Sequence, residues 1–256
     1  METIQPGSQK LQTSNEALIL GTTPVYHARP DDGQKHPGLV VIHEIWGLAP
    51  HIKDVANRFA AEGYSVWAPD LFQDTPIEGK IDAALMEEMN NPETRDEAQK
   101  KLRAFFAPTQ SPEFGKQTVV TLKTCLDHLL KNEGVNGEAG VLGFCFGGTY
   151  SFQLAIQDPR VKAAVAFYGQ PPKAEDIPRL HSPVLAFYGD QDAHLMQSLP
   201  ELEEEMKKNG KAFEAVVYPG VGHAFFNDMN TRMYNQDAAH SAWNKTLQFL
   251  SKNLRR

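Results

Sequence analysis

The sequence predicts an α/β fold, in which a mostly parallel central sheet of about seven or eight strands carries helices on both faces. Two observations point to this class. Short apolar runs alternate with longer segments whose apolar residues recur at helical spacing. Several of the short runs are apolar at nearly every position, which is typical of parallel strands buried on both faces. The 256 residues suit one domain that spans residues 1–256.

Apolar runs bounded by turn-forming residues are expected to be the strands. They are Pro24–Ala28, Gly38–His43, Tyr64–Ala68, Ala139–Phe144, Val161–Tyr168, Pro183–Tyr188 and Phe213–Tyr218. Residues 1–16 are polar, and we expect them to form a loose arm that leads into the first strand.

Helices are expected between these strands, where apolar residues recur three and four positions apart. The expected helices are His51–Glu62, Phe114–Lys131, the segment that follows residue 145, Leu199–Asn209 and Met233–Leu254. The stretch 74–112 departs from this alternation because it is charged, helical in composition and interrupted by prolines. It is expected to be a helical excursion of the same domain, placed where it could cover a substrate.

The composition excludes several classes of partner. The net charge of −7 argues against binding to nucleic acid or to an anionic membrane, so the expected partner is a small molecule. The first residues contain no apolar core of a secretory signal, and no apolar run is long enough to cross a bilayer. With only two cysteines, a disulfide framework is not expected. These features predict a cytoplasmic protein, either a monomer or a homodimer.

The strongest local motif is the G-x-C-x-G run Gly143–Gly147, which follows an expected strand and precedes an expected helix. In the related G-x-S-x-G turn, the nucleophile sits on a sharp bend, and small neighbours let the strand and helix approach each other. A thiol at a helix N-terminus is also favoured as thiolate. We therefore expect Cys145 to be a nucleophile, the alternative being a buried structural thiol. Cys125, within an apolar helix pattern, is expected to be an inert core thiol.

A thiol nucleophile needs a base, and the base needs an orienting acid. In α/β-hydrolases the chain order is nucleophile, acid, histidine. Asp190 and Asp192 both follow the strand that ends near residue 188, and Asp192 is preferred because the turn needs room before its side chain can reach the site. His223, on a glycine-rich loop after the last strand, is the expected base; the alternative is a surface loop histidine.

The loop after the second expected strand is a further candidate element of the site. It should supply one backbone N–H of an oxyanion hole from Ile45, and Phe146 should supply the other. An ordinary turn is the alternative. Metal binding by His43, Glu44 and His51 is disfavoured because their spacing differs from H-E-x-x-H, so neither a metal nor a cofactor is expected.

Four motifs together resemble those of the dienelactone hydrolase (carboxymethylenebutenolidase) family of the α/β-hydrolase superfamily. They are Gly143–Gly148, His43–Gly47, Pro69–Phe72 and Gly222–Phe225, and the similarity runs in order from about residue 20 onward. The resemblance implies an α/β-hydrolase fold and a triad of Cys145, Asp192 and His223. It also implies that Glu44 lies beside the nucleophile and exchanges a proton with the thiol when substrate arrives.

The family's substrate is an enol-lactone with a carboxylate held by arginines, one of which matches Arg95 by loose alignment. The other position holds Asn227 here, and the first aromatic residue of a pair after a strand, often tyrosine, is Phe167. At these two positions the chain departs from the family's pattern. The residues expected to contact the substrate are Trp46, Arg95, Phe167, Tyr168, Phe225 and Asn227.

The sequence thus predicts a carboxylic-ester hydrolase that cleaves a lactone or small activated ester through a cysteine-bound acyl-enzyme. Two alternatives remain: a general carboxylesterase or thioesterase on the same fold, and a ligand-binding relative without catalysis.

Overall fold

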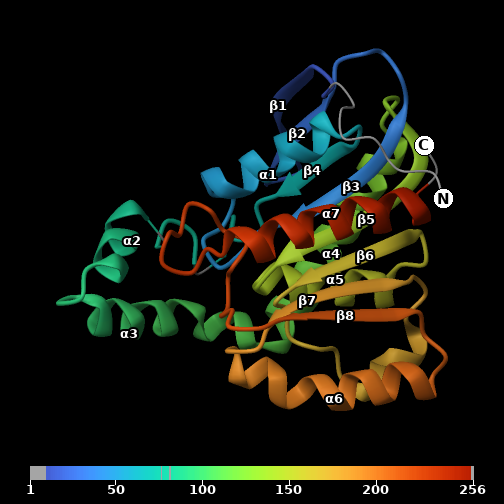
Figure 1. Ribbon diagram of the computed structural model, residues 1–256. Coiled ribbons are helices and arrows are strands. Elements are labelled where there is room, and N and C mark those ends of the chain that lie inside the picture. Colours follow the sequence, from blue (N-terminus) through green and yellow to red (C-terminus); the bar gives the residue numbers. More distant parts are fainter. Residues whose placement is uncertain (1–9, 76, 81, 255–256) are drawn as a thin grey trace.

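The computed structural model describes residues 10–75, 77–80 and 82–254, which form an eight-stranded sheet in the order β1-β2-β4-β3-β5-β6-β7-β8 (Figure 1). The strands are β1 (Thr13–Leu20), β2 (Thr23–Pro30), β3 (His36–Ile42), β4 (Ser65–Pro69), β5 (Val135–Phe144), β6 (Val161–Phe167), β7 (Val184–Gly189) and β8 (Phe213–Tyr218). Every pairing from β4 to β8 is parallel, whereas β2 pairs antiparallel with both β1 and β4. The prediction of a mostly parallel sheet is confirmed.

Helices cover both faces of this sheet. They are α1 (Pro50–Ala61), α2 (Ala83–Asn90), α3 (Arg95–Phe106), α4 (Pro112–Lys131), α5 (Phe146–Gln157), α6 (Ala193–Lys208) and α7 (Gln236–Asn253), with 3₁₀ turns η1 (Ala107–Gln110) and η2 (Ala174–Arg179). α1 and α7 cover one face, α4 and α5 cover the other, and α6 lies beside β8 (Figure 1). None of the helices within the described chain is both long and apolar enough to cross a membrane.

The central strands form the core because both of their faces are covered. In β3, β5, β6 and β7 almost every residue near the carboxyl end is buried, as expected for parallel strands between two helical layers. The carboxyl ends of these strands meet at one edge of the sheet. The loops that follow β3, β5, β7 and β8 therefore lie close together, and they carry all the residues of the expected triad and oxyanion hole.

Three expected elements differ from the structure. Within the stretch predicted to be a loose arm, residues 13–16 belong to β1, while residues 1–9 lie outside the described part. β1 is held by its backbone pairing with β2, and its exposed polar residues concealed it. The helix expected from Leu199 begins at Ala193 and contains Pro200 in its interior. The last helix begins at Gln236, where the Asn235 side chain accepts a hydrogen bond from the Ala238 amide.

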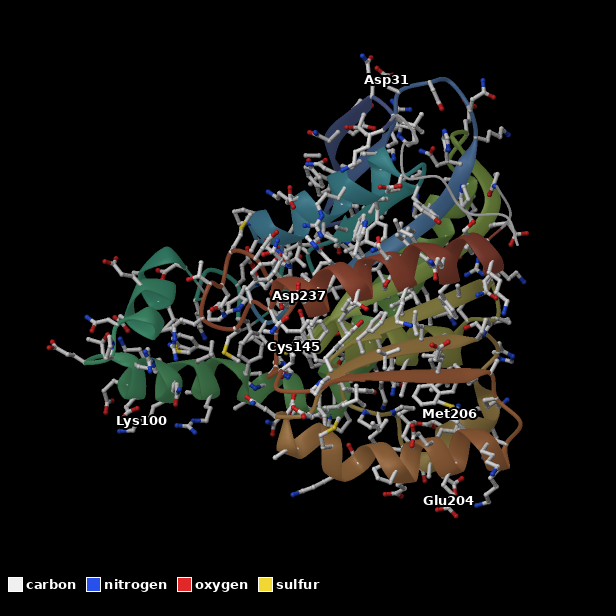
Figure 2. The ribbon with its side chains drawn as sticks, viewed as in Figure 1. Asp31, Lys100, Cys145, Glu204, Met206 and Asp237 are labelled. Carbon is white, nitrogen blue, oxygen red and sulfur yellow. The ribbon has the colours of Figure 1, made fainter. Side chains whose placement is uncertain are left out.

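The excursion between β4 and α4 contains α2, α3 and η1. Asp82 caps α2 by accepting a hydrogen bond from the Leu85 amide at 2.9 Å, and Ser111 caps α4 in the same way from the Phe114 amide. The helices α2 and α3 project from the body of the molecule, at the end of the sheet where the strand carboxyl ends lie (Figure 1). Cys145 lies at that same end (Figure 2).

Candidate active site

Cys145 occupies the tight turn between β5 and α5. Its backbone has φ of 53° and ψ of −111°, in a region that residues with a side chain rarely adopt. The turn is held by the Cys145 amide, which donates to the Phe167 carbonyl of β6 at 2.9 Å. Such strain persists only where the surrounding structure fixes it, and it is common at catalytic positions.

The glycines of the motif are required by the close approach of α5 to the sheet. A Cβ atom on Gly147 would lie 2.2 Å from the Ile42 carbonyl oxygen, and one on Gly143 would lie 2.3 Å from the Gly147 carbonyl oxygen. Both obstacles are backbone atoms, which cannot rotate away. Only glycine therefore fits at positions 143 and 147, where α5 begins against the end of β3.

Gly147→Ala is expected to lower the free energy of unfolding by about 3 kcal/mol or more, because the new methyl group would displace the backbone of β3. The matched control is Gly115→Ala in α4, where the nearest atom to the new Cβ lies 3.7 Å away. The control should change stability by at most about 1 kcal/mol, in the stabilising direction. Urea unfolding of both variants measures the difference, and equal stabilities would contradict the steric account.

The side chains of Cys145, Asp192 and His223 meet at the carboxyl edge of the sheet. His223 Nδ1 lies 2.5 Å from Asp192 Oδ2, and the Cys145 thiol lies close enough to the same imidazole to raise its pKa. Burial alone would lower the pKa of His223, but its hydrogen bonds to Asp192 and Cys145 outweigh burial and raise the pKa to about 10. Burial likewise opposes ionisation of Asp192, yet the bond to His223 leaves the pKa of that carboxyl below its usual value. The raised pKa makes His223 a strong proton acceptor beside the Cys145 thiol.

The loop geometry separates the two candidate acids. The Asp190 carboxylate turns away and accepts a hydrogen bond from the Gly220 amide at 2.8 Å. The Gln191 amide donates to the Val221 carbonyl at 3.0 Å, so the loops after β7 and β8 are tied together. Asp190 thus braces the loop that carries His223, whereas Asp192 contacts the imidazole itself.

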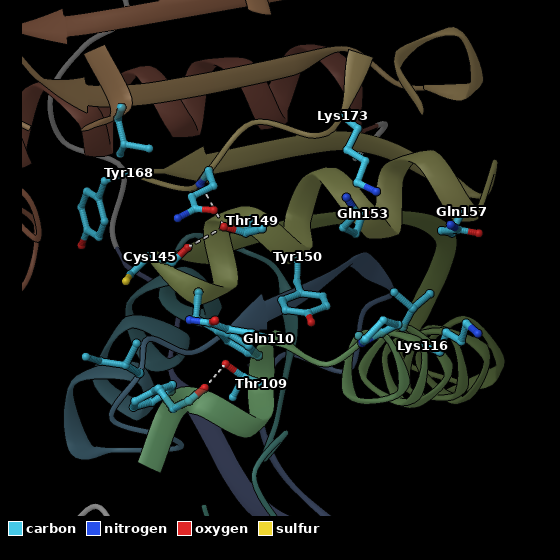
Figure 3. Close-up of a pocket in the computed structure, with 18 of the residues that line it drawn as sticks. Thr109, Gln110, Lys116, Cys145, Thr149, Tyr150, Gln153, Gln157, Tyr168 and Lys173 are labelled. Carbon is cyan, nitrogen blue, oxygen red and sulfur yellow. Dashed lines mark hydrogen bonds between the residues drawn. The ribbon is translucent and has the colours of Figure 1, made fainter. Parts of the chain in front are cut away.

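A cavity of about 1100 Å³ opens over the thiol (Figure 3). Cys145, His223, Ile45 and Phe146 all line it. In the described part of the chain, the amides of Ile45 and Phe146 have no backbone acceptor. Both amides are therefore available to a bound oxygen atom, as an oxyanion hole requires.

Away from the thiol, the same cavity runs between α4 and α5 and has a cationic wall. Lys116 and Lys123 share one face of α4, Gln153 lies opposite on α5, and Lys173 follows β6 (Figure 3). The carboxylate among the residues that line the cavity belongs to Asp192, which is engaged by His223. Although the chain carries a net charge of −7, this cavity is locally positive.

Glu44 lies next to this centre and is held by two donors. The Asn227 amide donates to its Oε2 at 2.6 Å, and the Tyr168 hydroxyl donates to its Oε1 at 3.2 Å. Tyr168 faces the cavity over Cys145, whereas Glu44 faces a second cavity of about 630 Å³. No hydrogen bond joins the Glu44 carboxyl to the Cys145 thiol in the described chain, and Tyr168 lies near both groups. Burial, followed by the charges of Glu44 and Cys145, raises the pKa of Tyr168 well above its usual range.

Burial raises the pKa of Glu44 to about 7, against the opposing effect of its two hydrogen bonds and of His223. Between pH 4.5 and 7 the unfolded chain loses this proton while the folded chain keeps it, so stability falls as pH rises through that window. The full penalty, about 3 kcal/mol, is present above pH 7.

Glu44→Gln should therefore leave stability nearly unchanged at pH 4.5 and raise it by up to about 3 kcal/mol at pH 8, because the amide stays neutral. Urea unfolding at the two pH values measures the effect. The control Glu201→Gln, at an exposed position, should leave the pH dependence as in the parent protein. Loss of stability in Glu44→Gln at pH 8 would contradict this account.

The expected substrate-contacting residues divide into three groups. Trp46, Arg95 and Asn227 line the second cavity with Glu44, and Tyr168 lines the first. The expectation that Phe167 and Phe225 contact the substrate is wrong, because neither ring lines either of these two cavities. Both rings are almost fully buried in the core, where Phe167 packs against Phe144, Phe187 and Phe226, and Phe225 packs against Tyr168 and Tyr218.

Two further expectations concern thiols and metals. Cys125 is buried in α4, and burial raises the pKa of its thiol to about 12, so it is a core residue as predicted. Over the described residues, no group of three or more His, Cys, Asp or Glu side chains is arranged to hold a metal ion. His43, Glu44 and His51 accordingly do not form such a group.

Several residues of the site carry no sequence signal that singles them out. The bond between Tyr168 and Glu44 joins residues 124 positions apart, and nothing in either motif indicates it. The sequence gives only a weak indication of the cationic wall. Lys116 and Lys123 are seven residues apart in an expected helix and so share one face of it, but nothing in the sequence places that face beside Cys145.

Comparisons with known proteins show the family of this chain. The model of the dienelactone hydrolase family matches residues 23–254. A Saccharolobus solfataricus protein assigned as a carboxymethylenebutenolidase is 34% identical over 232 residues, which cover 84% of this chain and 88% of that protein. A protein of Escherichia coli K12 with the same assignment is 28% identical over 264 residues, covering 94% of this chain and 90% of its own.

Solved structures with the same fold include a Klebsiella pneumoniae protein assigned as a dienelactone hydrolase. It has a TM-score of 0.75 at 26% identity, covering 94% of this chain and 98% of that one. P91, from metagenomic libraries and described as a dienelactone hydrolase-like promiscuous phosphotriesterase, has a TM-score of 0.73 at 21% identity, covering 96% and 99%. At that identity the second likeness shows the fold alone.

Proposed function

This chain belongs to the dienelactone hydrolase family, and we propose that it hydrolyses a lactone or a small activated ester with Cys145 as the nucleophile. The observation that carries the proposal is the convergence of the Cys145 thiol, the His223 imidazole and the Asp192 carboxylate beneath one cavity. A serine esterase mechanism would need a hydroxyl at the elbow, where this chain has a thiol.

In the proposed reaction, His223 takes the thiol proton and the Cys145 sulfur bonds to the carbonyl carbon of the substrate. The carbonyl electron pair moves onto oxygen, where the amides of Ile45 and Phe146 stabilise it. When the carbonyl re-forms, the carbon–oxygen bond to the alcohol breaks, and His223 returns the proton to the leaving oxygen. Water, activated by His223, then attacks the thioester and releases the acid and the free thiol.

Asp192 keeps the imidazole in the productive tautomer. Because the carboxylate accepts from Nδ1–H, the other ring nitrogen faces the thiol. The N-terminus of α5, which begins at Phe146, also favours negative charge on the sulfur and on the nearby oxyanion.

We assign Glu44 to proton exchange beside the nucleophile, as in the family. A carboxyl with a pKa of about 7 can both hold and accept a proton at neutral pH. In the present conformation it bonds to Tyr168, so exchange with the thiol requires either rotation of Glu44 or passage of the proton through the Tyr168 hydroxyl.

A panel of lactones and p-nitrophenyl esters tests the proposal on the parent protein. Turnover should be abolished by iodoacetamide, and added substrate should protect against that inactivation. The panel includes esters of equal acyl length with and without a terminal carboxylate, because the cationic wall should favour the charged ester at low salt. No turnover of any member, together with tight binding of one, would support the non-catalytic alternative.

A further inference from the structure

His43 is a buried histidine that reaches neither cavity, and it is bonded on both ring nitrogens. Its side chain is completely buried at the end of β3. The Leu71 amide donates to its Nε2 at 3.0 Å, and its Nδ1 lies 2.6 Å from the Glu44 carbonyl oxygen. A backbone N–H can only donate, so Nε2 must accept. The proton of the neutral ring is therefore on Nδ1, which donates to Glu44.

The Glu44 carbonyl and the Ile45 N–H belong to the same peptide group. Because a peptide group is planar, a bond that holds the carbonyl oxygen also sets the direction of the N–H on the opposite side. The Gly47 amide donates to the same oxygen at 3.2 Å, so this carbonyl is held from two directions. Ile45 is the proposed first donor to the oxyanion.

His43 also contacts the residue that carries the second donor. Its ring lies nearly parallel to the Phe146 ring, with centroids 5.8 Å apart and an interplanar angle of 12°. Phe72 packs against both rings, with its centroid 4.6 Å from that of His43 and 5.3 Å from that of Phe146. The buried imidazole of His43 is thus bonded to the peptide group that carries the Ile45 N–H, and it packs against the side chain of Phe146, the residue that supplies the second N–H.

We propose that His43 is a positioning residue that directs the Ile45 amide at the oxyanion. The Leu71 amide holds the His43 ring in place for this role. The role rests on the proposed function, since it needs the charge that develops on the substrate oxygen when the Cys145 sulfur bonds to the carbonyl carbon. Donors aimed at that oxygen act in the transition state, so their loss lowers kcat more than it raises KM. Burial lowers the pKa of His43, which keeps the ring neutral as this bonding pattern requires.

Two amide variants separate the two hydrogen bonds of the ring. In His43→Asn the side-chain nitrogen takes the place of Nδ1 and can still donate to Glu44, while the Leu71 amide loses its acceptor. In His43→Gln the side-chain oxygen takes the place of Nε2 and can still accept from Leu71, while the Glu44 carbonyl loses its donor. Each variant loses one hydrogen bond and the aromatic ring, so the pair is matched for general disturbance of the core.

The test measures kcat and KM for p-nitrophenyl acetate beside the rate of Cys145 alkylation by iodoacetamide, which forms no oxyanion. His43→Gln should lower kcat by about 10- to 100-fold and change KM only about twofold. This loss of kcat is smaller than the loss expected when an oxyanion donor is removed completely. His43→Asn should stay within about fivefold of the parent, and both should be alkylated at nearly the parental rate. Equal losses of kcat in the two variants, or alkylation that falls in step with kcat, would overturn the positioning role. Turnover that persists in Cys145→Ala would instead refute the cysteine mechanism, and this role with it.

Discussion

Cys145→Ala is expected to lower kcat for p-nitrophenyl acetate by at least about 10⁴-fold, the largest effect of any single substitution in this chain. The sulfur of Cys145 is the atom that bonds to the acyl group, and the alanine methyl group has no nucleophilic atom to replace it. The remaining oxyanion donors and the cavity can give only weak catalysis by water. Initial rates on the purified variant measure the loss.

The fold should survive this change, because Cys145 is only partly buried and its backbone strain does not depend on the sulfur atom. Circular dichroism and a thermal melt close to those of the parent provide that control. Cys125→Ala is the matched variant, since it removes the other thiol, which lies in the core of α4, and kcat should then be retained. Hydrolysis by Cys145→Ala at the parental rate would refute the proposed nucleophile.

Asp192→Asn is the second large expected effect, a fall in kcat of about 10³- to 10⁴-fold. The carboxylate accepts from Nδ1–H of His223 at 2.5 Å, whereas an amide can present its own N–H there and select the opposite tautomer. The ring nitrogen facing Cys145 would then carry a proton and could not accept one from the thiol. The pKa of His223 should also fall, because the negative charge that favours the imidazolium is gone.

Asp190→Asn is the control, since it lies two residues away on the same loop but bonds to the Gly220 amide. Its kcat should fall only severalfold, through a looser His223 loop. A pH–rate profile of each variant distinguishes the two roles. If Asp190→Asn lost as much activity as Asp192→Asn, the acid would have been assigned to the wrong residue.

The parts of the fold that follow from strong local patterns could be predicted. The carboxyl-terminal parts of the buried parallel strands β5 (139–144) and β6 (163–167) are continuous apolar runs, so their positions follow from composition. β1 could not be predicted because its stability comes from pairing with β2, while its residues are largely exposed. The start of α6 was placed too late because proline is typical of the first turn of a helix, whereas α6 begins at Ala193 and already buries Leu195 and Leu199 before Pro200.

The site was predictable where chemistry requires a fixed spacing, and unpredictable where distant residues meet. The glycines around Cys145 are required by backbone contacts that every such elbow must make, so the motif could be recognised. The preference for Asp192 followed from turn geometry. In contrast, Phe167 and Tyr168 are adjacent aromatic residues of similar size and equal burial, yet only Tyr168 lines the cavity, which no sequence pattern indicates.

The central claim is that hydrolysis proceeds through an acyl group on Cys145. Intact-protein mass spectrometry after rapid acid quench of a reaction with a slowly released ester tests it most directly. The account predicts one added acyl group per chain, mapped by peptide digestion to Cys145 and absent from Cys145→Ala. An acyl group on another residue, or steady-state turnover of that ester with no acylated protein after the quench, would contradict it.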